Sequence, residues 1–489
     1  MTGAPPGPAG GATGAQGAGT APPKFAAAAR AALADTALRR GLRGAAAAVR
    51  ERRSADPEPA DWEDLREAGR AVKDGTLLAL DAHLEELERA VTEAGGRVHW
   101  AADAAEARRI VTGLVRAAGA SEVVKSTSSV TREIGLNGAL ARAGVTVRET
   151  GFAELVARLG EDDPAGPASA APYSDRARIR ELFVRRLPGA AGGVSDDPAA
   201  LAEAARLHLR ERFLGARVAV TGANFLVAET GTVVLLESEG NGRMCLTLPE
   251  TLISVAGIEK VVPTWADMEV LLQLLPRSSS GAPMTPYVSS WTGVTPGDGP
   301  REFHLVLLDN GRTKALADEV GRAALRCIGC SACLHVCPVY ERTGPAPYGP
   351  VRAGPIGAIL TPQLRGVERA AEASLPFAST LCGACADVCP VKIDIPEVLV
   401  HLRGRVVESR RHRPVPTPEL VLMRGLAWTM AEPRRYEAAL RRGTRWARLM
   451  SRGGRIRRLP GLLGKWTEAR DLPAPPPETF RAWWARRRG

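Results

Sequence analysis

The sequence lacks any uninterrupted apolar run of the length that a membrane-spanning helix needs, so no transmembrane segment is predicted. The N-terminus also lacks the basic start and apolar core of a secretory signal, and it has no twin arginine. It reads instead MTGAPPGPAGGATGAQGAGTAPPKF, and this Gly-, Ala- and Pro-rich composition predicts disorder over residues 1–24. We therefore expect a cytoplasmic protein.

Fingerprints of nucleotide and nucleic-acid binding are missing as well. The chain contains no G-x-G-x-x-G and no Walker sequence, so nothing indicates a bound flavin, nicotinamide or nucleotide. It also contains no helix-turn-helix, zinc-finger or aromatic RNA-binding pattern. We therefore expect no nucleic-acid partner.

Excess positive charge is confined to one end of the chain. The net charge is +11, but residues 401–489 hold 22 Arg and Lys against seven Asp and Glu, which leaves −4 for the first 400 residues. This basic region, helical in composition, could dock on anionic lipid or an acidic partner subunit, or it could be a solvated Arg-rich surface. Trp483 and Trp484 beside Arg486–Arg488 would also suit peripheral contact with the inner face of a membrane.

Periodicity predicts helices first and then an α/β domain. Residues 25–59 have helical composition, and the next stretch, WEDLREAGRAVKDGTLLALDAHLEELERAVTEAG, has the apolar spacing of an amphipathic helix. Short β-like pieces then alternate with helical ones, beginning with RVHW, AEARRIVTGLVRAAG and EVVKS. Such alternation predicts a parallel sheet with helices on its faces, in a domain over residues 60–312.

Two segments of this domain break the alternation. Residues 160–175, GEDDPAGPASAAPYSD, predict a loop. The Val-, Leu- and Thr-rich segment ARVAVTGANFLVAETGTVVLLESEGNGRMCLTLPETLISVAG is punctuated by glycines, and we expect three or four strands joined by tight turns there. Cys245 would then lie in an apolar strand.

Seven of the eight cysteines form two short runs within residues 313–400. Because a reducing compartment disfavours disulfides, metal ligation is the natural alternative. The first run, CIGCSACLHVCP, has the Cys-x2-Cys-x2-Cys-x3-Cys-Pro spacing of bacterial ferredoxins, and the second, TLCGACADVCPV, repeats it without its first cysteine. Zinc also binds Cys-x2-Cys pairs, but this doubled spacing favours iron–sulfur clusters in a small helical, ferredoxin-like domain.

Ferredoxin spacing predicts that each run supplies ligands to both of two [4Fe-4S] clusters. The first cluster would take three cysteines of the first run and the last one of the second run: Cys327, Cys330, Cys333 and Cys389. The second cluster would take the other three, Cys337, Cys382 and Cys385, and would be one thiolate short. Three answers to the missing ligand are open. Ser379 occupies the vacant position of the repeat, Cys245 could reach in from the α/β domain, or the corner has no protein ligand, as in a [3Fe-4S] cluster or a cubane with one labile iron. His335, inside the first run, would tune a cluster or face solvent.

Three polar stretches of the α/β domain, KSTSSVTREIG, VTGANFLVAETGT and ESEGNGRM, lie where predicted strands end. Open α/β sheets bind small ligands at such positions. The candidate substrate contacts are Lys125, Ser126, Glu229 and Arg243. The two cations could anchor a carboxylate and Glu229 could be catalytic, although ordinary surface cations and a solvated turn carboxylate are the alternatives.

Taken together, VKSTSSVTREIGLNGAL, AVTGANFLVAETGT, SEGNGR and LPETLISVAGIEKVVPTW resemble the lactate-utilisation (LUD) domain. With the two cysteine runs and the C-terminal LPAPPPETFRAWW, nearly the whole chain after residue 60 is similar to the LutB family of lactate-utilisation iron–sulfur proteins. The resemblance implies a fold related to the sugar-phosphate isomerase and CoA-transferase group, and two [4Fe-4S] clusters. One departure is Tyr173, in APYSDRARI, where the family has a His-containing segment.

The resemblance further implies a cytoplasmic three-component system that oxidises L-lactate to pyruvate. In it this protein would be an iron–sulfur electron-transfer subunit beside a cysteine-rich subunit and a second LUD-domain subunit. Without a flavin or nicotinamide fingerprint, the chain alone would not be a complete L-lactate dehydrogenase. One alternative is an iron–sulfur subunit of another 2-hydroxy acid or glycerol phosphate dehydrogenase, which the absence of a CCG pair counts against. Another is a redox-cluster scaffold or sensor without catalysis of its own.

Overall fold

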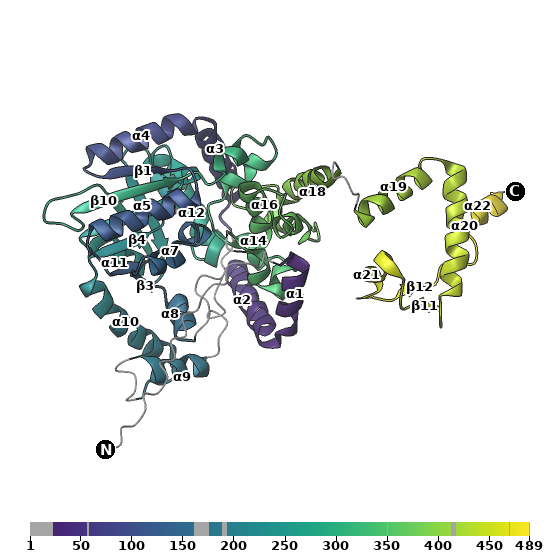
Figure 1. Ribbon diagram of the computed structural model, residues 1–489, viewed down its shortest axis with the longest axis horizontal. Coiled ribbons are helices and arrows are strands. Elements are labelled where there is room, and N and C mark those ends of the chain that lie inside the picture. The colour runs from purple at the N-terminus through teal and green to yellow at the C-terminus, as the bar shows by residue number, and fades with distance from the viewer. Residues whose placement is uncertain are drawn as a thin grey trace, which may run out of the picture. The chain divides into compact units, whose positions relative to one another are not determined.

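The computed structural model describes residues 23–55, 58–160, 176–187, 193–349, 351–411, 417–468 and 470–488. The chain forms two compact units, Met1–Arg405 and Val406–Gly489. The N-terminal stretch predicted to be disordered and the predicted loop with Tyr173 lie almost wholly outside the described residues. Figure 1 labels the helices and strands of both units.

The first unit is built on a six-stranded parallel sheet with the order β1-β10-β7-β4-β2-β3. Its strands are β1 (Arg97–Ala101), β10 (Glu302–Leu308), β7 (Thr251–Gly257), β4 (Val218–Thr221), β2 (Glu122–Lys125) and β3 (Thr146–Glu149). A parallel sheet is covered on both faces, which explains why its central strands are almost continuous apolar runs. The sheet confirms the predicted parallel α/β architecture.

Side chains along β10 alternate between two hydrophobic cores, one on each face of the sheet. Phe303 and Leu305 pack into the first core, and Val306 and Leu308 into the second. The helices of the first core are α4 (Leu80–Glu93), α10 (Pro198–Gly215) and α11 (Asn241–Thr247). Those of the second core are α5 (Ala104–Ala117), α6 (Ser129–Glu133) and α7 (Leu136–Arg142). Figure 1 labels α4, α10, α11, α5 and α7 around the sheet.

A second, four-stranded sheet has the order β8-β5-β6-β9. Its strands are β8 (Val261–Val262), β5 (Phe225–Val227), β6 (Thr232–Glu237) and β9 (Tyr287–Thr292). Helix α12 (Trp265–Ser280) packs against β5 and β8, and it begins with a capping box between Thr264 and Asp267.

The prediction that only strands and turns lie between residues 216 and 257 is wrong for one segment. Four strands form there, but α11 is a helix, and Cys245 lies in it rather than in a strand. The Glu237 carboxylate, at the end of β6, accepts hydrogen bonds from the backbone N–H groups of Gly242 and Arg243, both at 2.7 Å. It thereby satisfies donors that the first turn of a helix leaves unpaired.

The helical segments before the sheet differ from the prediction in detail. The amphipathic stretch after residue 60 forms two helices, α3 (Trp62–Leu78) and α4, which are separated at Ala79. The lead-in over residues 25–59 contains α1 (Phe25–Ala34) and α2 (Thr36–Ala55). These two helices pack against the cysteine-containing region: the Phe25 N–H donates to Ser374 Oγ at 2.8 Å, and Leu42 is buried in the same core as two of the cysteines.

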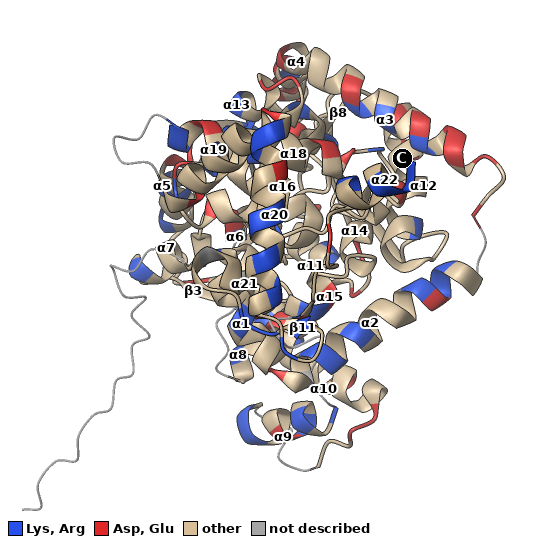
Figure 2. Ribbon diagram, turned by 90° about the vertical axis from the view of Figure 1, so that its right-hand side faces the viewer, with Lys and Arg blue, Asp and Glu red and all other residues tan. Residues whose placement is uncertain are grey.

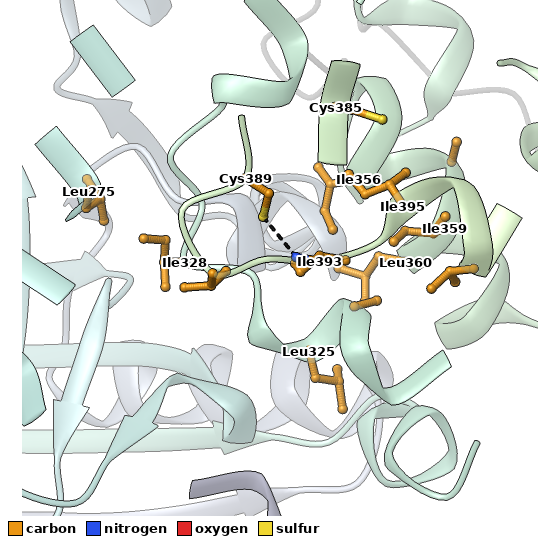
Figure 3. Close-up of a cluster of buried hydrophobic side chains, with 14 of the residues drawn as sticks. Leu275, Leu325, Ile328, Ile356, Ile359, Leu360, Cys385, Cys389, Ile393 and Ile395 are labelled. Carbon is orange, nitrogen blue, oxygen red and sulfur yellow. Dashed lines mark hydrogen bonds between the residues drawn. The ribbon is translucent and has the colours of Figure 1, made fainter. Parts of the chain in front are cut away.

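The cysteine-containing region consists of short helices around loops. They are α13 (Arg312–Leu316), η4 (Gly321–Arg326), α14 (Ala332–His335), α15 (Tyr340–Thr343), η5 (Ala346–Tyr348), α16 (Gly354–Arg365), η6 (Glu372–Phe377), α17 (Ala384–Asp387) and α18 (Ile395–Arg411). Figure 3 shows part of their core, in which Ile328, Ile356 and Ile393 surround Cys389. The same core includes Phe225 from the second sheet. The α/β and cysteine-containing parts therefore share one continuous hydrophobic core.

The remaining elements are α8 (Phe152–Leu159) and α9 (Arg176–Arg186), which pack with α10, and those of the second unit. The second unit contains α19 (Pro418–Met430), α20 (Pro433–Leu449), β11 (Arg455–Ile456), η7 (Gly461–Leu463), α21 (Gly464–Thr467), β12 (Leu472–Pro473) and α22 (Phe480–Arg488). Figure 2 shows Lys and Arg residues along α20 and α22. Across the described part of the chain, no helix is both long and apolar enough to cross a membrane.

Candidate iron–sulfur site and the polar pocket beside it

Four cysteines from the two runs line one cavity of about 240 Å³. They are Cys327, Cys330, Cys333 and Cys389. The first three are brought together by a loop in which Gly329 and Ser331 have positive φ values of 83° and 64°. Cys389 follows α17, and its Sγ accepts a hydrogen bond from the Ile393 N–H at 3.3 Å (Figure 3). The four residues that the spacing groups for the first cluster therefore face the same space.

The other three clustered cysteines form a separate group. Burial raises the pKa of Cys385 to about 12, and the charges of Cys337 and Cys382 add to the effect, so these three lie near one another. The Tyr340 N–H points toward Cys337 Sγ at 3.5 Å, and Cys382 is exposed. Figure 3 shows the Cys385 and Cys389 side chains pointing in different directions, although they belong to the same run.

The donor set fits iron–sulfur clusters chemically. All eight cysteines are free thiols. Burial raises the pKa of Cys330 to about 12, with further increases from Cys327 and Cys389, so the metal-free site favours neutral thiols. Iron reverses that preference, because a metal binds the thiolate. Within the described ranges, no three His, Cys, Asp or Glu side chains are grouped closely enough to hold a single metal ion.

The candidates for the eighth ligand occupy very different environments. Ser379 lies beside the second group in sequence, and its Oγ accepts a hydrogen bond from the Leu381 N–H at 3.1 Å. Cys245 is fully buried in the core on one face of the main sheet, with its Sγ 3.9 Å from Thr150 Oγ1. Six of the other seven cysteines, all but the exposed Cys382, belong to or pack against a different core, so Cys245 is a buried side chain of the α/β domain. His335 lies in α14 but does not line the four-cysteine cavity.

A small polar pocket of about 20 Å³ lies at the ends of β2 and β3. Lys125 and Glu149 form an ion pair in it, with 2.8 Å between Nζ and Oε1, and both side chains are buried. Glu149 Oε1 also accepts a hydrogen bond from Asn137 Nδ2 at 2.7 Å, whereas its buried Oε2 makes no hydrogen bond to any described residue. Arg132 lines both this pocket and the four-cysteine cavity. The two spaces are therefore neighbours.

The predicted substrate contacts are only partly brought together. Ser126 follows Lys125, and its buried hydroxyl makes no hydrogen bond within the described part of the chain. Glu229 lies elsewhere: its Oε1 accepts a hydrogen bond from the Trp265 N–H at 2.7 Å, at the start of α12. Arg243 lies on α11 with its guanidinium 5.6 Å from the centre of the Tyr287 ring. Neither Glu229 nor Arg243 lines either cavity.

Sequence reasoning did not identify a buried charge network between the sheet and the cysteine-containing region. Arg312 Nη1 lies 3.0 Å from Glu133 Oε1, and Arg312 Nε lies 2.5 Å from Glu259 Oε2. All three side chains are buried. Next to Arg312, Lys260 Nζ donates to the Cys327 carbonyl at 3.0 Å. Lys73 Nζ donates to the Glu259 carbonyl at 2.6 Å, and burial lowers the pKa of Lys73 to about 7. The acidic and basic residues in VAGIEKVV, directly after an apolar strand, are the signal that could have indicated this network.

A parallel α/β domain joined to a cavity lined by four thiols defines a class of iron–sulfur protein. Three family models match the chain. The model of the LUD domain matches residues 84–308, and the model of the 4Fe-4S dicluster domain matches residues 323–393. The model described as 'Lactate utilisation protein B, C-terminal' matches residues 403–489.

The chain belongs to the lactate utilisation protein B family. It is 41% identical over 433 residues to Lactate utilization protein B of Oceanobacillus iheyensis, covering 88% of this chain and 89% of the relative. It is 39% identical over 453 residues to Lactate utilization protein B 1 of Bacillus mycoides, covering 92% and 93%. A solved duf162 family protein from Deinococcus radiodurans aligns with 47% of this chain and 98% of its own, at 14% identity and a TM-score of 0.26.

Proposed function

We propose that this protein is the iron–sulfur electron-transfer subunit of a complex that oxidises L-lactate to pyruvate. The supporting observation is the grouping of cysteines from both runs around one cavity, with the other three cysteines apart from it. Each cluster, when bound, accepts and releases one electron at a time. Two clusters in one small domain therefore suit transfer between a two-electron donor and a separate acceptor.

The proposed ligands follow from this grouping. Cys327, Cys330, Cys333 and Cys389 would hold the first cluster. Cys337, Cys382 and Cys385 would hold the second, with Ser379 as the candidate eighth ligand. If Ser379 is not a ligand, the second cluster has an open corner and would be either a [3Fe-4S] cluster or a [4Fe-4S] cluster with one labile iron. The protein packs Ile328, Ile356 and Ile393 around the first site, and such an apolar lining lowers the local dielectric constant around a cluster.

The α/β domain would contribute the Lys125 pocket. Lys125 and Ser126 are the proposed contacts for the substrate or for a group bound to a partner. Of the four predicted contacts, these two lie at the ends of the parallel strands beside the proposed clusters. We propose a cysteine-rich subunit and a second LUD-domain subunit as partners, because the sequence has no flavin or nicotinamide fingerprint of its own. Contact of the C-terminal region with the inner face of a membrane is a further part of the proposal.

The test is L-lactate-dependent dye reduction by the anaerobically prepared protein together with its partner subunits. Cys330→Ser and Cys385→Ser should each lower the iron content and abolish dye reduction. Cys245→Ser is the matched control, because this cysteine is buried outside both groups, and it should keep iron and activity. Full activity in either cluster variant, or a wild-type protein that contains zinc and no iron, would contradict the proposal.

A second candidate is a cluster-bearing scaffold without electron transfer of its own. The exposed Cys382 favours a site at which another protein contacts the second cluster, and both functions share this feature. The same assay separates them, since a scaffold would retain dye reduction when either cluster is lost.

A further inference from the structure

A lysine from the α/β domain reaches the first cysteine run. Lys260 ends the 3₁₀ turn η3 (Ile258–Lys260), which directly follows the central strand β7. It is 4% exposed, and its Nζ donates a hydrogen bond to the Cys327 carbonyl at 3.0 Å. The ammonium group is therefore fixed, away from water, against the backbone of a proposed cluster ligand.

The acidic residues near Lys260 are already paired with another cation. Glu259 and Glu133 both bind Arg312, so this triad carries a net charge of −1. Lys260 balances this charge, and Lys73, which hydrogen-bonds to the Glu259 carbonyl, adds a partial positive charge near pH 7, because burial lowers its pKa to about 7. A positive charge in a buried site acts strongly because it is poorly screened by water and salt.

Arginine side chains also lie beside the four-cysteine cavity, two of them paired with carboxylates: Arg132 with Glu154 and Arg66 with Glu63. None of the described residues that line it is an Asp or a Glu, and two are Arg132 and Arg352. Arg66 donates to the Cys389 carbonyl at 3.0 and 3.2 Å. Beside the second group, the corresponding backbone contact is from Arg403, which donates to the Ser379 carbonyl at 3.2 Å.

We propose that Lys260 is a residue of the α/β domain that raises the reduction potential of the first cluster and leaves that of the second almost unchanged. This inference rests on the cluster assignment in the proposed function. Reduction adds one electron, and hence one negative charge, to the cluster without breaking a bond. A buried ammonium stabilises the reduced, more negative state more than the oxidised one.

The expected effect is on the order of tenfold. Two unit charges separated by several ångströms at an effective dielectric constant of about 20 change a one-electron equilibrium by at least that factor. Replacing Lys260 with methionine should therefore lower the ratio of reduced to oxidised first cluster, at a fixed potential, by about tenfold. For a one-electron couple this equals a shift of about 59 mV to a more negative midpoint potential.

The experiment is an EPR-monitored redox titration of the full chain with its clusters, using dithionite as the reductant. Cys330→Ser and Cys385→Ser first assign one signal to each cluster. Lys260→Met should shift the midpoint of the first cluster and not of the second, whereas Lys260→Arg, which keeps the charge, should stay close to wild type. Lys392→Met is the matched control: Lys392 is three residues from Cys389, but it is paired at the surface with Glu63 and Glu67 and should have little effect.

Iron and sulfide contents make the result interpretable. If Lys260→Met binds iron poorly, Lys73→Met removes the second buried ammonium without touching the Cys327 backbone, and it should give a smaller shift in the same direction. An unshifted first cluster in a fully loaded Lys260→Met protein would overturn this inference and leave the proposed function intact. Equal shifts of both clusters would also overturn it. Absence of iron from the wild-type protein would overturn both.

Discussion

Arg312→Met is expected to cause a large loss of stability, because Arg312 balances two buried carboxylates. Its side chain is 3% exposed, and its partners Glu133 and Glu259 are 4% and 8% exposed. Removing one partner of a buried ion pair costs about 3–5 kcal/mol, because the other charge stays buried. At about 2.1 cal/mol/K per residue, the unit Met1–Arg405 has an unfolding entropy of about 0.85 kcal/mol/K, so we expect Tm to fall by roughly 3.5–6 °C.

The pH dependence of this loss has a definite sign. In the wild-type protein, burial raises the pKa of Glu259, but Arg312 and Lys260 outweigh burial and bring it to about 2, below the usual 4.5. Ionised Glu259 therefore contributes stability above pH 4.5 that is lost as the pH falls toward 2. Without Arg312, the burial that raises the pKa of Glu259 would be opposed less, and ionised Glu259 would destabilise the fold. The difference between variant and wild type should thus be largest near neutral pH and smaller in acid.

Thermal unfolding followed by circular dichroism at about pH 7 and pH 5 measures both effects. Arg312→Lys keeps the charge and should lose less stability. Arg109→Met removes an exposed arginine that is paired with Glu106, and it should change Tm by little. An Arg312→Met protein that melts within about 2 °C of wild type, or whose deficit grows in acid, would refute the reasoning.

Three further predictions concern single sites. Lys125→Met should lower the free energy of unfolding, measured in urea, by about 3–5 kcal/mol, because it leaves the Glu149 carboxylate buried without its cation. The double variant Lys125→Met/Glu149→Leu should be more stable than the single variant. The opposite order would contradict a buried ion pair. Gly231→Ala should lower the free energy of unfolding by more than about 1 kcal/mol in the same assay, because φ is 67° and a Cβ would lie 2.6 Å from a backbone nitrogen of α4. Gly113 lies inside a helix with open space around it, so Gly113→Ala should not destabilise the protein. Cys245→Ala should retain the full iron content by chemical assay, and loss of iron would place this thiol among the ligands.

The main sheet could be predicted because its strands are short apolar runs between amphipathic helices. Parallel strands buried on both faces leave this pattern even without long-range information. The segment around Cys245 misled the prediction, since its Val and Leu content resembles the neighbouring strands. What makes it helical is the Glu237 carboxylate, whose effect depends on where β6 ends.

Ferredoxin spacing predicts a crossed arrangement of ligands, and the four cysteines that it groups line one cavity, whereas their ligation of a cluster stays a prediction. The surroundings of that space could not be predicted in the same way. Lys260 lies 67 residues from Cys327 in the sequence, and Arg312 lies 179 residues from Glu133. Such contacts depend on tertiary packing. Glu229, in contrast, looked like a site residue and instead binds the first turn of α12, a role that short-range spacing does not distinguish from catalysis.

The most direct test of the account is whether the two cysteine runs cross between clusters. Iron and sulfide analysis with EPR of the dithionite-reduced protein should be done on Cys389→Ser beside Cys330→Ser and Cys385→Ser. If the runs cross, Cys389→Ser should lose or alter the same cluster signal as Cys330→Ser and leave the signal affected by Cys385→Ser in place. If Cys389→Ser instead alters the signal affected by Cys385→Ser, each run builds its own cluster and the account is contradicted.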